Sequence, residues 1–503
     1  MSGGRDGLPS GWTIAPLSSV AESCLGKMLD QVKHTTGKKL PYLRNINVRW
    51  TRFDLSDLSE MYFDDDELER YGLRQNDVLV CEGGEPGRAA VWRDGATGIK
   101  IQKALHRVRP SEALLPDWLV HSLKLDAHCG RLLEHFTGTT IKHLTGTSLA
   151  RYDVRVPPLQ EQKRIVAKIE ALQARSDAAK EALDAIPPLL EKFRQSVLAA
   201  AFRGDLTKKW REAHPQAESA SKLLGRIRAE RRRKWQEANP SKQYVEPEAA
   251  DTEGLPELPE GWCWATVEEL ASLVTKGASP GWQGFEYTSD GIVFLRSQNV
   301  GWGELRLDGV ARVPESLNAH QPRSVIAEAD VLLNIVGASI GRAALADERL
   351  VAANTNQAVA IIRLVAGGLD PAALMYWLLS PESQRRVHLG KVDVARANYS
   401  LADIAGLPVP LPPAKEQRAI VGVLREVLER ESALKAALVE QACQLSSMNQ
   451  SILAKAFRGE LVPQDPNDEP ASVLLDRIRR ERAAASDQGT VKRGRGRPKS
   501  ATP

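Results

Sequence analysis

The stretch Ser196-Val-Leu-Ala-Ala-Ala-Phe-Arg-Gly-Asp-Leu206 recurs as Ser451-Ile-Leu-Ala-Lys-Ala-Phe-Arg-Gly-Glu-Leu461, which begins 255 residues later. Other matching segments occur in the same order in both halves of the chain. The chain is therefore predicted to be two copies of one unit of about 250 residues, a period too long for a solenoid. The further matches are Leu8-Pro-Ser-Gly-Trp12 with Leu258-Pro-Glu-Gly-Trp262, Asp77-Val-Leu and Gly87-Arg-Ala-Ala90 with Asp330-Val-Leu and Gly341-Arg-Ala-Ala344, Pro157-Pro-Leu-Gln-Glu-Gln162 with Pro412-Pro-Ala-Lys-Glu-Gln417, and Ser221-Lys-Leu-Leu-Gly-Arg-Ile-Arg228 with Ser472-Val-Leu-Leu-Asp-Arg-Ile-Arg479.

The overall composition is that of a folded globular protein. The chain has 503 residues, of which 42% are hydrophobic and 26% charged, which excludes a wholly disordered or collagen-like chain. It contains no apolar run long enough to span a membrane and no apolar signal region at its start, so we expect a cytoplasmic location and no membrane partner. The five cysteines form no C-x-x-C pair, and the chain has no H-E-x-x-H motif, so we predict neither a metal site nor a disulfide framework.

The charge is unevenly distributed along the chain. Lys and Arg number 68 against 64 Asp and Glu, a net charge of +4. Residues 490–503 contain five of these cations and no acid, so the rest of the chain is close to neutral. Any binding of nucleic acid by the two repeated units must therefore depend on local basic residues.

Each repeat opens with short apolar runs that are separated by Gly-rich turns. This pattern predicts strands with a few short helices, hence an α/β or α+β domain whose strand order the sequence leaves open. The expected strands lie at 77–81 and 89–92 in the first repeat and at 291–295, 330–336 and 357–362 in the second, and the expected helices at 117–125 and 371–379.

Each repeat then continues with a stretch of strong helix formers, residues 160–202 in the first copy. Apolar residues recur there in alternating steps of four and three, the spacing of a coiled-coil seam, and a helix of about 43 residues would be roughly 65 Å long. Pro187 and Pro188 predict a kink or break in the first copy, whereas the second has Ala442 and Cys443 there and should be straighter. The predicted seam residues are Ile165, Ile169, Leu172, Leu183, Ile186 and Leu190, and in the second copy Ile420, Leu424, Val427, Leu434, Leu438 and Leu445.

Two arrangements of these helices are open. Each helix can fold onto its own domain, or the two can pair with each other. We favour pairing, because two equal units related by a two-fold axis perpendicular to the helices place the pair antiparallel. The two globular domains would then lie at opposite ends of a rod that acts as a ruler.

The L-P-x-G-W opening, the P-P-x-x-E-Q helix start and the A-F-R-G-[DE]-L helix end, each present twice and in this order, resemble the DNA-specificity subunit of type I restriction–modification enzymes. The resemblance covers about residues 8–485. It implies the division 1–157 first target recognition domain, 158–204 first spacer helix, 205–257 charged linker, 258–412 second target recognition domain, 413–459 second spacer helix, 460–489 C-terminal segment and 490–503 basic tail.

The resemblance implies a function in reading double-stranded DNA. The two domains would bind the two halves of a split target, and the helix pair would set the spacing between the halves. The subunit itself would hold no cofactor and catalyse nothing. It would dock two methyltransferase subunits, which use S-adenosylmethionine to methylate adenine N6, and two restriction subunits, which use ATP and Mg²⁺.

The chain lacks the motifs that would argue for an enzyme. It contains no N-P-P-[FY] or D-P-P-Y tetrapeptide and no phosphate loop of the G-x-x-x-x-G-K-[ST] type. Two alternatives stay open at this point: a degenerate methyltransferase or nuclease, and a coiled-coil adaptor that binds only protein.

Equivalent loops of the two repeats hold side chains of the kinds that read DNA. Arg and Lys recognise guanine, Asn and Gln recognise adenine, and cations bind phosphates. For each loop the alternative is a solvated strand end or hairpin turn without DNA contact. The predicted DNA-binding residues are Arg44, Asn45, Asn47, Arg88, Lys103, Thr140 and Lys142 in the first repeat, and Arg296, Asn299, Ser339, Arg342, Gln357, Arg396 and Asn398 in the second.

The basic run 226–234 in the linker has three possible roles: a solvated helical face, a DNA contact or a surface toward the methyltransferase. The solvated face is the favoured one of these.

The tail Lys492-Arg-Gly-Arg-Gly-Arg-Pro-Lys499 resembles an AT-hook, whose Arg495 and Arg497 would lie in the minor groove of A·T-rich DNA. The alternative is a disordered basic tail that binds phosphates without preference.

Removal of residues 490–503 is expected to weaken DNA binding with little regard to sequence. Fewer neutralised phosphates release fewer counterions, so the dependence of log K on log salt should become less steep. The measurement is DNA affinity of full-length and truncated chain across a salt series. An unchanged slope would contradict a DNA-binding tail.

Overall fold

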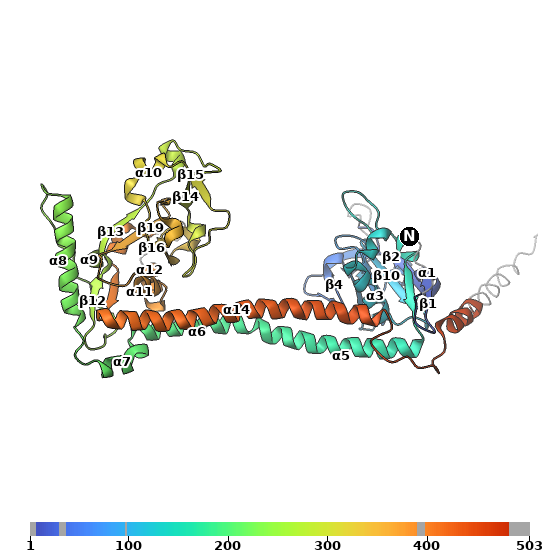
Figure 1. Cartoon of the computed structure of the whole chain (residues 1–503). Coiled ribbons are helices and arrows are strands. Elements are labelled where there is room, and N and C mark those ends of the chain that lie inside the picture. The colour runs from blue at the N-terminus through green and yellow to red at the C-terminus, as the bar shows by residue number, and fades with distance from the viewer. Residues whose placement is uncertain (1–6, 30–36, 96–97, 390–397, 482–503) are drawn as a thin grey trace, which may run out of the picture. The chain divides into compact units, whose positions relative to one another are not determined.

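The computed structural model describes residues 7–29, 37–95, 98–389 and 398–481. They form two compact units. The first combines the chain up to residue 183 with the chain from 439 onward, and the second spans 184–438. In Figure 1 each unit is a globular part with its own segments of long helix. No helix of the described ranges is long and apolar enough to cross a membrane.

The globular part of the first unit is a small mixed domain built on antiparallel strands. A four-stranded sheet has the order β2-β10-β7-β8, and a three-stranded sheet has the order β6-β3-β9. Helix α3 (Pro116–His128) belongs to the core that also holds strands of the four-stranded sheet. The strands are β1 (Thr13–Pro16) paired with β11 (Asp153–Val156), β2 (Ala21–Leu25), β10 (Leu105–Pro110), β7 (Val78–Cys81), β8 (Ala89–Val91), β6 (Ser59–Phe63), β3 (Lys38–Leu43), β9 (Lys100–Ile101), and the short pair β4 (Val48–Arg49) and β5 (Arg52–Phe53).

The second unit repeats this topology. Its four-stranded sheet has the order β13-β19-β16-β17 and its three-stranded sheet the order β15-β14-β18. Helix α11 (Pro371–Leu378) takes the place of α3, so the expected α+β character and the expected strands and short helices are found in both repeats. The strands are β12 (Cys263–Thr266) paired with β20 (Pro408–Leu411), β13 (Ala271–Lys276), β19 (Val359–Leu364), β16 (Val331–Asn334), β17 (Ala343–Leu345), β15 (Ala311–Val313), β14 (Ile292–Leu295) and β18 (Asn354–Thr355).

The long helical stretches differ in continuity. In the first repeat α5 (Leu159–Asp184) and α6 (Ile186–Phe202) are separated at Ala185, because the ring of a proline and its missing N–H do not fit a helix interior. In the second repeat α14 (Ala414–Ala456) is one helix of 43 residues.

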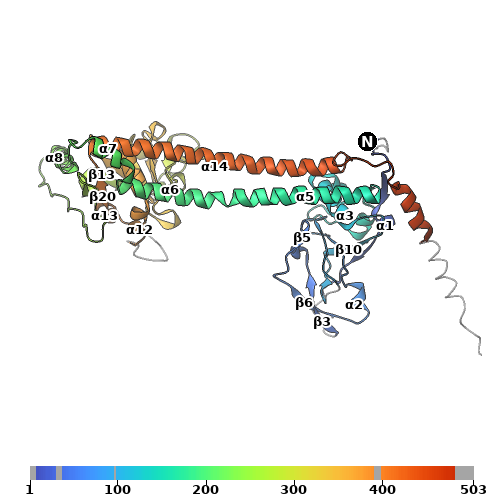
Figure 2. The same cartoon turned by 90° about the horizontal axis from the view of Figure 1, so that it is seen from below.

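Within the first unit, α5 lies beside the last turns of α14, as Figure 2 shows. There the amide of Asn449 donates to the Ser176 hydroxyl at 2.8 Å. Within the second unit, α6 lies beside the first turns of α14, and residues of both helices belong to one core. Of the predicted seam residues, Ile165, Ile169, Ile420 and Leu424 are fully buried, whereas Leu434 is 45% exposed and the others are half-buried.

The repeated motifs contact each other at the start of each long helix. The indole Nε1 of Trp12 donates to the Glu161 carboxylate at 3.0 Å, and Trp262 donates to Glu416 at 2.8 Å. Both glutamates are buried. The L-P-x-G-W opening is thus hydrogen-bonded to the P-P-x-x-E-Q helix start in both units. In the first unit, burial raises the pKa of Glu161.

The end of each long helix packs on the globular part of the other repeat. Phe457 stacks on Trp118 in the first unit, with ring centroids 4.1 Å apart. Phe202 meets Trp377 edge to face at 5.3 Å in the second unit. Gly459 follows with a φ of 73°, which allows the chain to leave the helix.

The segments after the long helices are packed rather than free. Helix α8 (Ala220–Ala238) lies in the second unit, where Ala220 N donates to Gly261 O at 2.8 Å. Residues 471–481 form the equivalent helix in the first unit, where Ala471 N donates to Gly11 O at 2.9 Å. Within the basic run, Arg228 donates to the buried Glu269. Part of this run therefore holds α8 to the second domain. The rest is a solvated face, as predicted, because the side chains of Arg226, Arg232, Arg233 and Lys234 are 45–58% exposed.

Acid is expected to destabilise the first unit through His121. Burial on α3 lowers the pKa of this imidazole from 6.5 to about 4, with smaller effects of Lys124 and Asp117. The unfolded chain then binds a proton that the folded chain does not, so stability is lost as the pH falls from 6.5 toward 4. The loss between pH 7 and pH 5 should be about 2 kcal/mol in the free energy of unfolding.

The measurement is urea unfolding of the full chain at both pH values, compared between wild type and His121→Gln. The exposed His128 offers the matched control His128→Gln. Parallel pH profiles for wild type and His121→Gln would refute this source of acid sensitivity.

Candidate nucleic-acid interface

Four segments of the first domain come together around the loop between β7 and β8. They are the loop after β3 (44–47), the loop between β7 and β8 (82–88), the turn between β9 and β10 (102–104) and a hairpin at 137–143. The Asn45 amide donates to Gly83 O at 3.3 Å, which joins the first two segments. Glu82 joins the other two, because its N donates to Ala104 O and its O accepts from Leu144 N, both at 2.8 Å.

The second domain assembles the equivalent segments. The Asn334 amide at the end of β16 donates to Ser297 O at 2.7 Å, which fixes the loop after β14 (296–299). Ile335 N donates to Ala358 O at 2.9 Å, so the loop at 336–342 lies beside the turn that holds Gln357. Val336 forms a β-bridge with Asn398. The structure thus brings together most of the predicted DNA-binding residues of each domain.

The predicted residues differ in how freely they can meet a ligand. Thr140, Lys142 and Asn398 are exposed. Arg44 is partly engaged with Asp57 at 2.7 Å, and its side chain is 27% exposed. The remaining half-buried positions are Asn45, Lys103, Arg296, Ser339, Arg342 and Gln357.

Arg88 is directed inward rather than toward solvent. Its side chain is 14% exposed, pairs with Glu85 at 2.8 Å and donates to Asn45 O at 2.9 Å. This residue supports the loop after β3, so a direct phosphate contact by Arg88 does not fit the geometry. Arg396, Arg495 and Arg497 lie outside the described residues.

Asn47 and Asn299 are structural, which corrects the prediction that they read bases. Both are 2% exposed. Asn47 accepts a hydrogen bond from Arg44 N at 2.9 Å and donates to Asp57 O at 2.8 Å, and Asn299 accepts from Arg296 N at 2.9 Å. Each asparagine closes the 3-10 turn that presents the residue before it.

Sequence reasoning missed Asn334, which is fully buried and holds the loop of the second domain. The available signal was a lone amide at the end of the apolar run Val331-Leu-Leu-Asn334. A buried amide at a strand end satisfies backbone carbonyls that the sheet does not reach.

An ion pair with a buried aspartate is common to both domains. Arg109 donates to Asp77 at 2.7 Å in the first, and Arg363 donates to Asp330 at 2.8 Å in the second. The two aspartates are those of the repeated Asp-Val-Leu motif. They also accept backbone N–H groups from the preceding turn, so this motif anchors the start of β7 and of β16.

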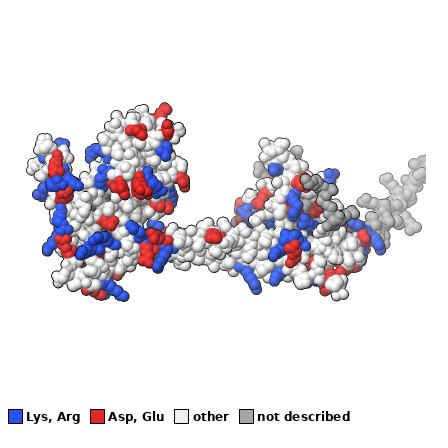
Figure 3. All heavy atoms as spheres, in the orientation of Figure 1, with Lys and Arg blue, Asp and Glu red and all other residues white. Residues whose placement is uncertain are grey.

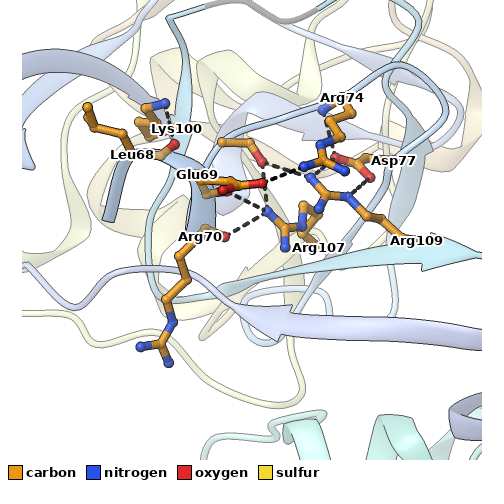
Figure 4. A network of polar contacts seen from close by, with 9 residues as sticks. Leu68, Glu69, Arg70, Arg74, Asp77, Lys100, Arg107 and Arg109 are labelled. Atoms are coloured by element: carbon orange, nitrogen blue, oxygen red, sulfur yellow. Dashed lines mark hydrogen bonds and ion pairs between the residues drawn. The ribbon is translucent and has the colours of Figure 1, made fainter. Parts of the chain in front are cut away.

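The first domain adds a network of cations around α2 (Glu67–Arg70), drawn in Figure 4. Arg107 donates to Arg70 O at 2.7 Å and to Gly72 O at 2.8 Å, and Lys100 donates to Leu68 O at 2.7 Å. Burial lowers the pKa of Arg107. The second domain has Ile361 in the corresponding register, so this network belongs to the first domain alone among the described residues.

Charge on the two globular parts is mixed. In Figure 3, Lys and Arg are interspersed with Asp and Glu on the face shown. This distribution agrees with a nearly neutral chain whose ligand contacts are made by individual loops rather than by one basic face.

Replacement of Asn47 by Ala is expected to lower the free energy of unfolding by about 1–3 kcal/mol, because it leaves buried backbone groups unpaired. Asn299→Ala should do the same in the second unit. The measurement is urea unfolding, and the exposed neighbour Gln298→Ala is the control without a stability effect. Full stability of Asn47→Ala together with a loss of DNA affinity would restore the base-reading role.

Known proteins with similar sequences are specificity subunits. The chain is 24% identical over 509 residues to the EcoKI type I restriction enzyme specificity subunit of Escherichia coli K12, covering 96% of this chain and 98% of that protein. It is 29% identical over 344 residues to the EcoBI specificity subunit of Escherichia coli, covering 66% of this chain and 64% of that protein. This chain thus spans just under two thirds of the EcoBI subunit.

Solved structures share the fold. The crystal structure of the HsdS subunit from Thermoanaerobacter tengcongensis has a TM-score of 0.56 at 22% identity and covers 92% of this chain and 100% of that one. A chain from a study of complex assembly and conformational transition of the type I R-M system has a TM-score of 0.64 at 22% identity, covering 90% of this chain and 99% of that one.

The family model for the type I restriction modification DNA specificity domain matches residues 9–187 and 309–442, more than half of the sequence. The chain therefore belongs to the family of type I restriction–modification DNA specificity proteins.

Proposed function

We propose that this chain is the DNA-reading subunit of a type I restriction–modification complex, and that each globular domain binds one half of a split target. The observation that carries the proposal is the occurrence of the same converging loops twice in one chain of this family. The domains share the asparagine that closes the turn and the Arg–Asp pair but differ in exposed side chains, as expected of two readers of different sequences.

In this proposal the loops after β3 and β14 and the hairpin at 137–143 supply the groups that meet the base edges. Arg44, Asn45 and Lys142 act in the first domain, and Arg296 and Gln357 act in the second. Arginine and lysine suit guanine, whereas asparagine and glutamine suit adenine. The buried asparagines and the Arg–Asp pairs keep these loops in place, which limits the ordering cost of binding.

The spacing between the half-sites is set by an antiparallel coiled coil of α5 and α6 with α14. The hydrogen bond between Asn449 and Ser176 and the seating of both helix ends in a globular core support this arrangement. A polar pair between two helices helps to fix their register.

The same helices carry apolar side chains that their own unit leaves uncovered. These exposed apolar residues are the candidate contacts for protein partners, here the two methyltransferase subunits and the restriction subunits. The exposed residues are Leu189 at 61%, Phe193 at 50%, Val439 at 67% and Met448 at 47%.

The chain has no catalytic role of its own: the partner methyltransferase uses S-adenosylmethionine to methylate adenine N6, and the restriction subunits use ATP and Mg²⁺.

A map of N6-methyladenine across the source genome tests this function. Deletion of the gene should abolish methylation at one split motif. A variant gene is then returned to the deletion strain, with seven residues inserted into both helices, after Gln173 and after Glu429. It should restore methylation at the same half-sites with a gap about 3 base pairs longer, because seven helical residues add about 10.5 Å.

A matched control carries the insertion in α14 alone. It should lose methylation, because the two helices no longer have equal length. Retention of the original gap in the double insertion would contradict the ruler. Unchanged methylation after deletion of the gene, in cells that still contain the partner methyltransferase, would contradict the proposed function.

A further inference from the structure

Two aliphatic side chains stand exposed among the polar loops of the first domain. Ile46 is 45% exposed in the loop after β3, and Ile141 is 67% exposed in the hairpin at 137–143. Single exposed aliphatic residues are common on protein surfaces, so exposure alone assigns no role. Their position is what distinguishes this pair.

Both residues lie on segments that are joined to the same short loop. The residue before Ile46 is bonded to Gly83 O, and the hairpin is followed at once by Leu144, which donates to Glu82 O. Ile46 and Ile141 therefore belong to the one cluster that also presents Arg44, Thr140 and Lys142.

The hairpin is built so that Ile141 faces outward. Its base is closed by the hydrogen bonds Thr137 N to His143 O at 2.8 Å and His143 N to Thr137 O at 2.9 Å. Gly138 has a φ of 94°, and a Cβ at this position would lie 2.2 Å from Ile141 O. Only glycine permits this close approach to the Ile141 carbonyl, and in the hairpin so closed the Ile141 side chain is exposed.

The second domain differs at the equivalent position. Gln298 occupies the place of Ile46 in a turn with the same hydrogen bonds, and it is exposed. An aliphatic group has no donor or acceptor for base edges, but it can pack against the one apolar group of the major groove, the 5-methyl of thymine. A glutamine in the same place suits adenine.

We propose that the first domain reads thymine through its 5-methyl group by means of Ile46 and Ile141. The proposal rests on the proposed DNA-reading function and names the base that this domain selects. The aliphatic side chains cover the methyl group, and the neighbouring Arg44 and Lys142 hold the adjacent phosphates or guanines.

The test removes single methyl groups from the DNA. The full chain, in complex with its methyltransferase partner, binds duplexes that carry the mapped motif, and each thymine of both half-sites is replaced in turn by deoxyuridine. Affinity is measured by fluorescence anisotropy. Loss of one buried methyl should weaken binding by about three- to fivefold at one or more positions.

The variants Ile46→Ala and Ile141→Ala assign the effect. At a sensitive position, one of them should weaken binding to the thymine duplex by a similar factor and should bind the thymine and deoxyuridine duplexes equally. Gln298→Ala should weaken binding while the deoxyuridine effect persists. Leu133→Ala, an exposed leucine of the first domain at 52%, should leave both affinities unchanged.

Three results would overturn the proposal: a target without thymine in the half-site of the first domain, no deoxyuridine sensitivity, or a sensitivity that both isoleucine variants retain. Failure of the proposed function is distinguishable, because the complex would then bind the motif no better than a scrambled duplex.

Discussion

The structure depends on the completion of each globular core by the end of the other repeat's helix. Phe457 stacks on Trp118 in the first unit, and Phe202 meets Trp377 in the second. These contacts join residues more than 170 positions apart along the chain, and they bury large aromatic surfaces that dominate core energetics. Neither repeat is therefore a closed folding unit, which explains why the A-F-R-G motif occurs at both helix ends with little change.

The start of each long helix is held to its globular domain by buried polar groups. Glu416 is fully buried and accepts hydrogen bonds from the Trp262 indole, the Thr207 hydroxyl and the Arg211 guanidinium. A buried carboxylate is tolerated only when it is paired in this way. Glu161 has fewer donors from its own unit, and burial accordingly raises its pKa. The globular parts and the long helices are thus joined by directional contacts at the helix start and by apolar contacts at the helix end.

Much of this architecture could be predicted from the sequence, because periodicity and repetition report on local structure and on duplicated contacts. The strands around Val78 and Val331 and the interruption beside Pro187 follow from apolar runs and from proline chemistry. The roles of single polar side chains could not be predicted in this way. Asn47 and Asn299 are of the residue type that reads adenine, but their loops turn them inward. Only the three-dimensional path of the loop decides whether such an asparagine reads a base or supports the turn. Arg228 likewise belongs to a charged run whose partner, Glu269, lies 41 residues later.

A constant frame beneath variable loops explains how two domains of one design can differ in what they read. The pairs Arg109 with Asp77 and Arg363 with Asp330 occupy equivalent places, as do the asparagines that close the turns after β3 and β14. The two aspartates and the two asparagines are buried, so a change in any of them leaves an unpaired polar group and costs stability. The exposed residues beside these asparagines can change without leaving a buried polar group unpaired. Exchange of Ile46 for Gln298 alters the chemistry presented to a ligand while the turn beneath keeps its hydrogen bonds, so the selectivity of the surface can change without a change in the fold.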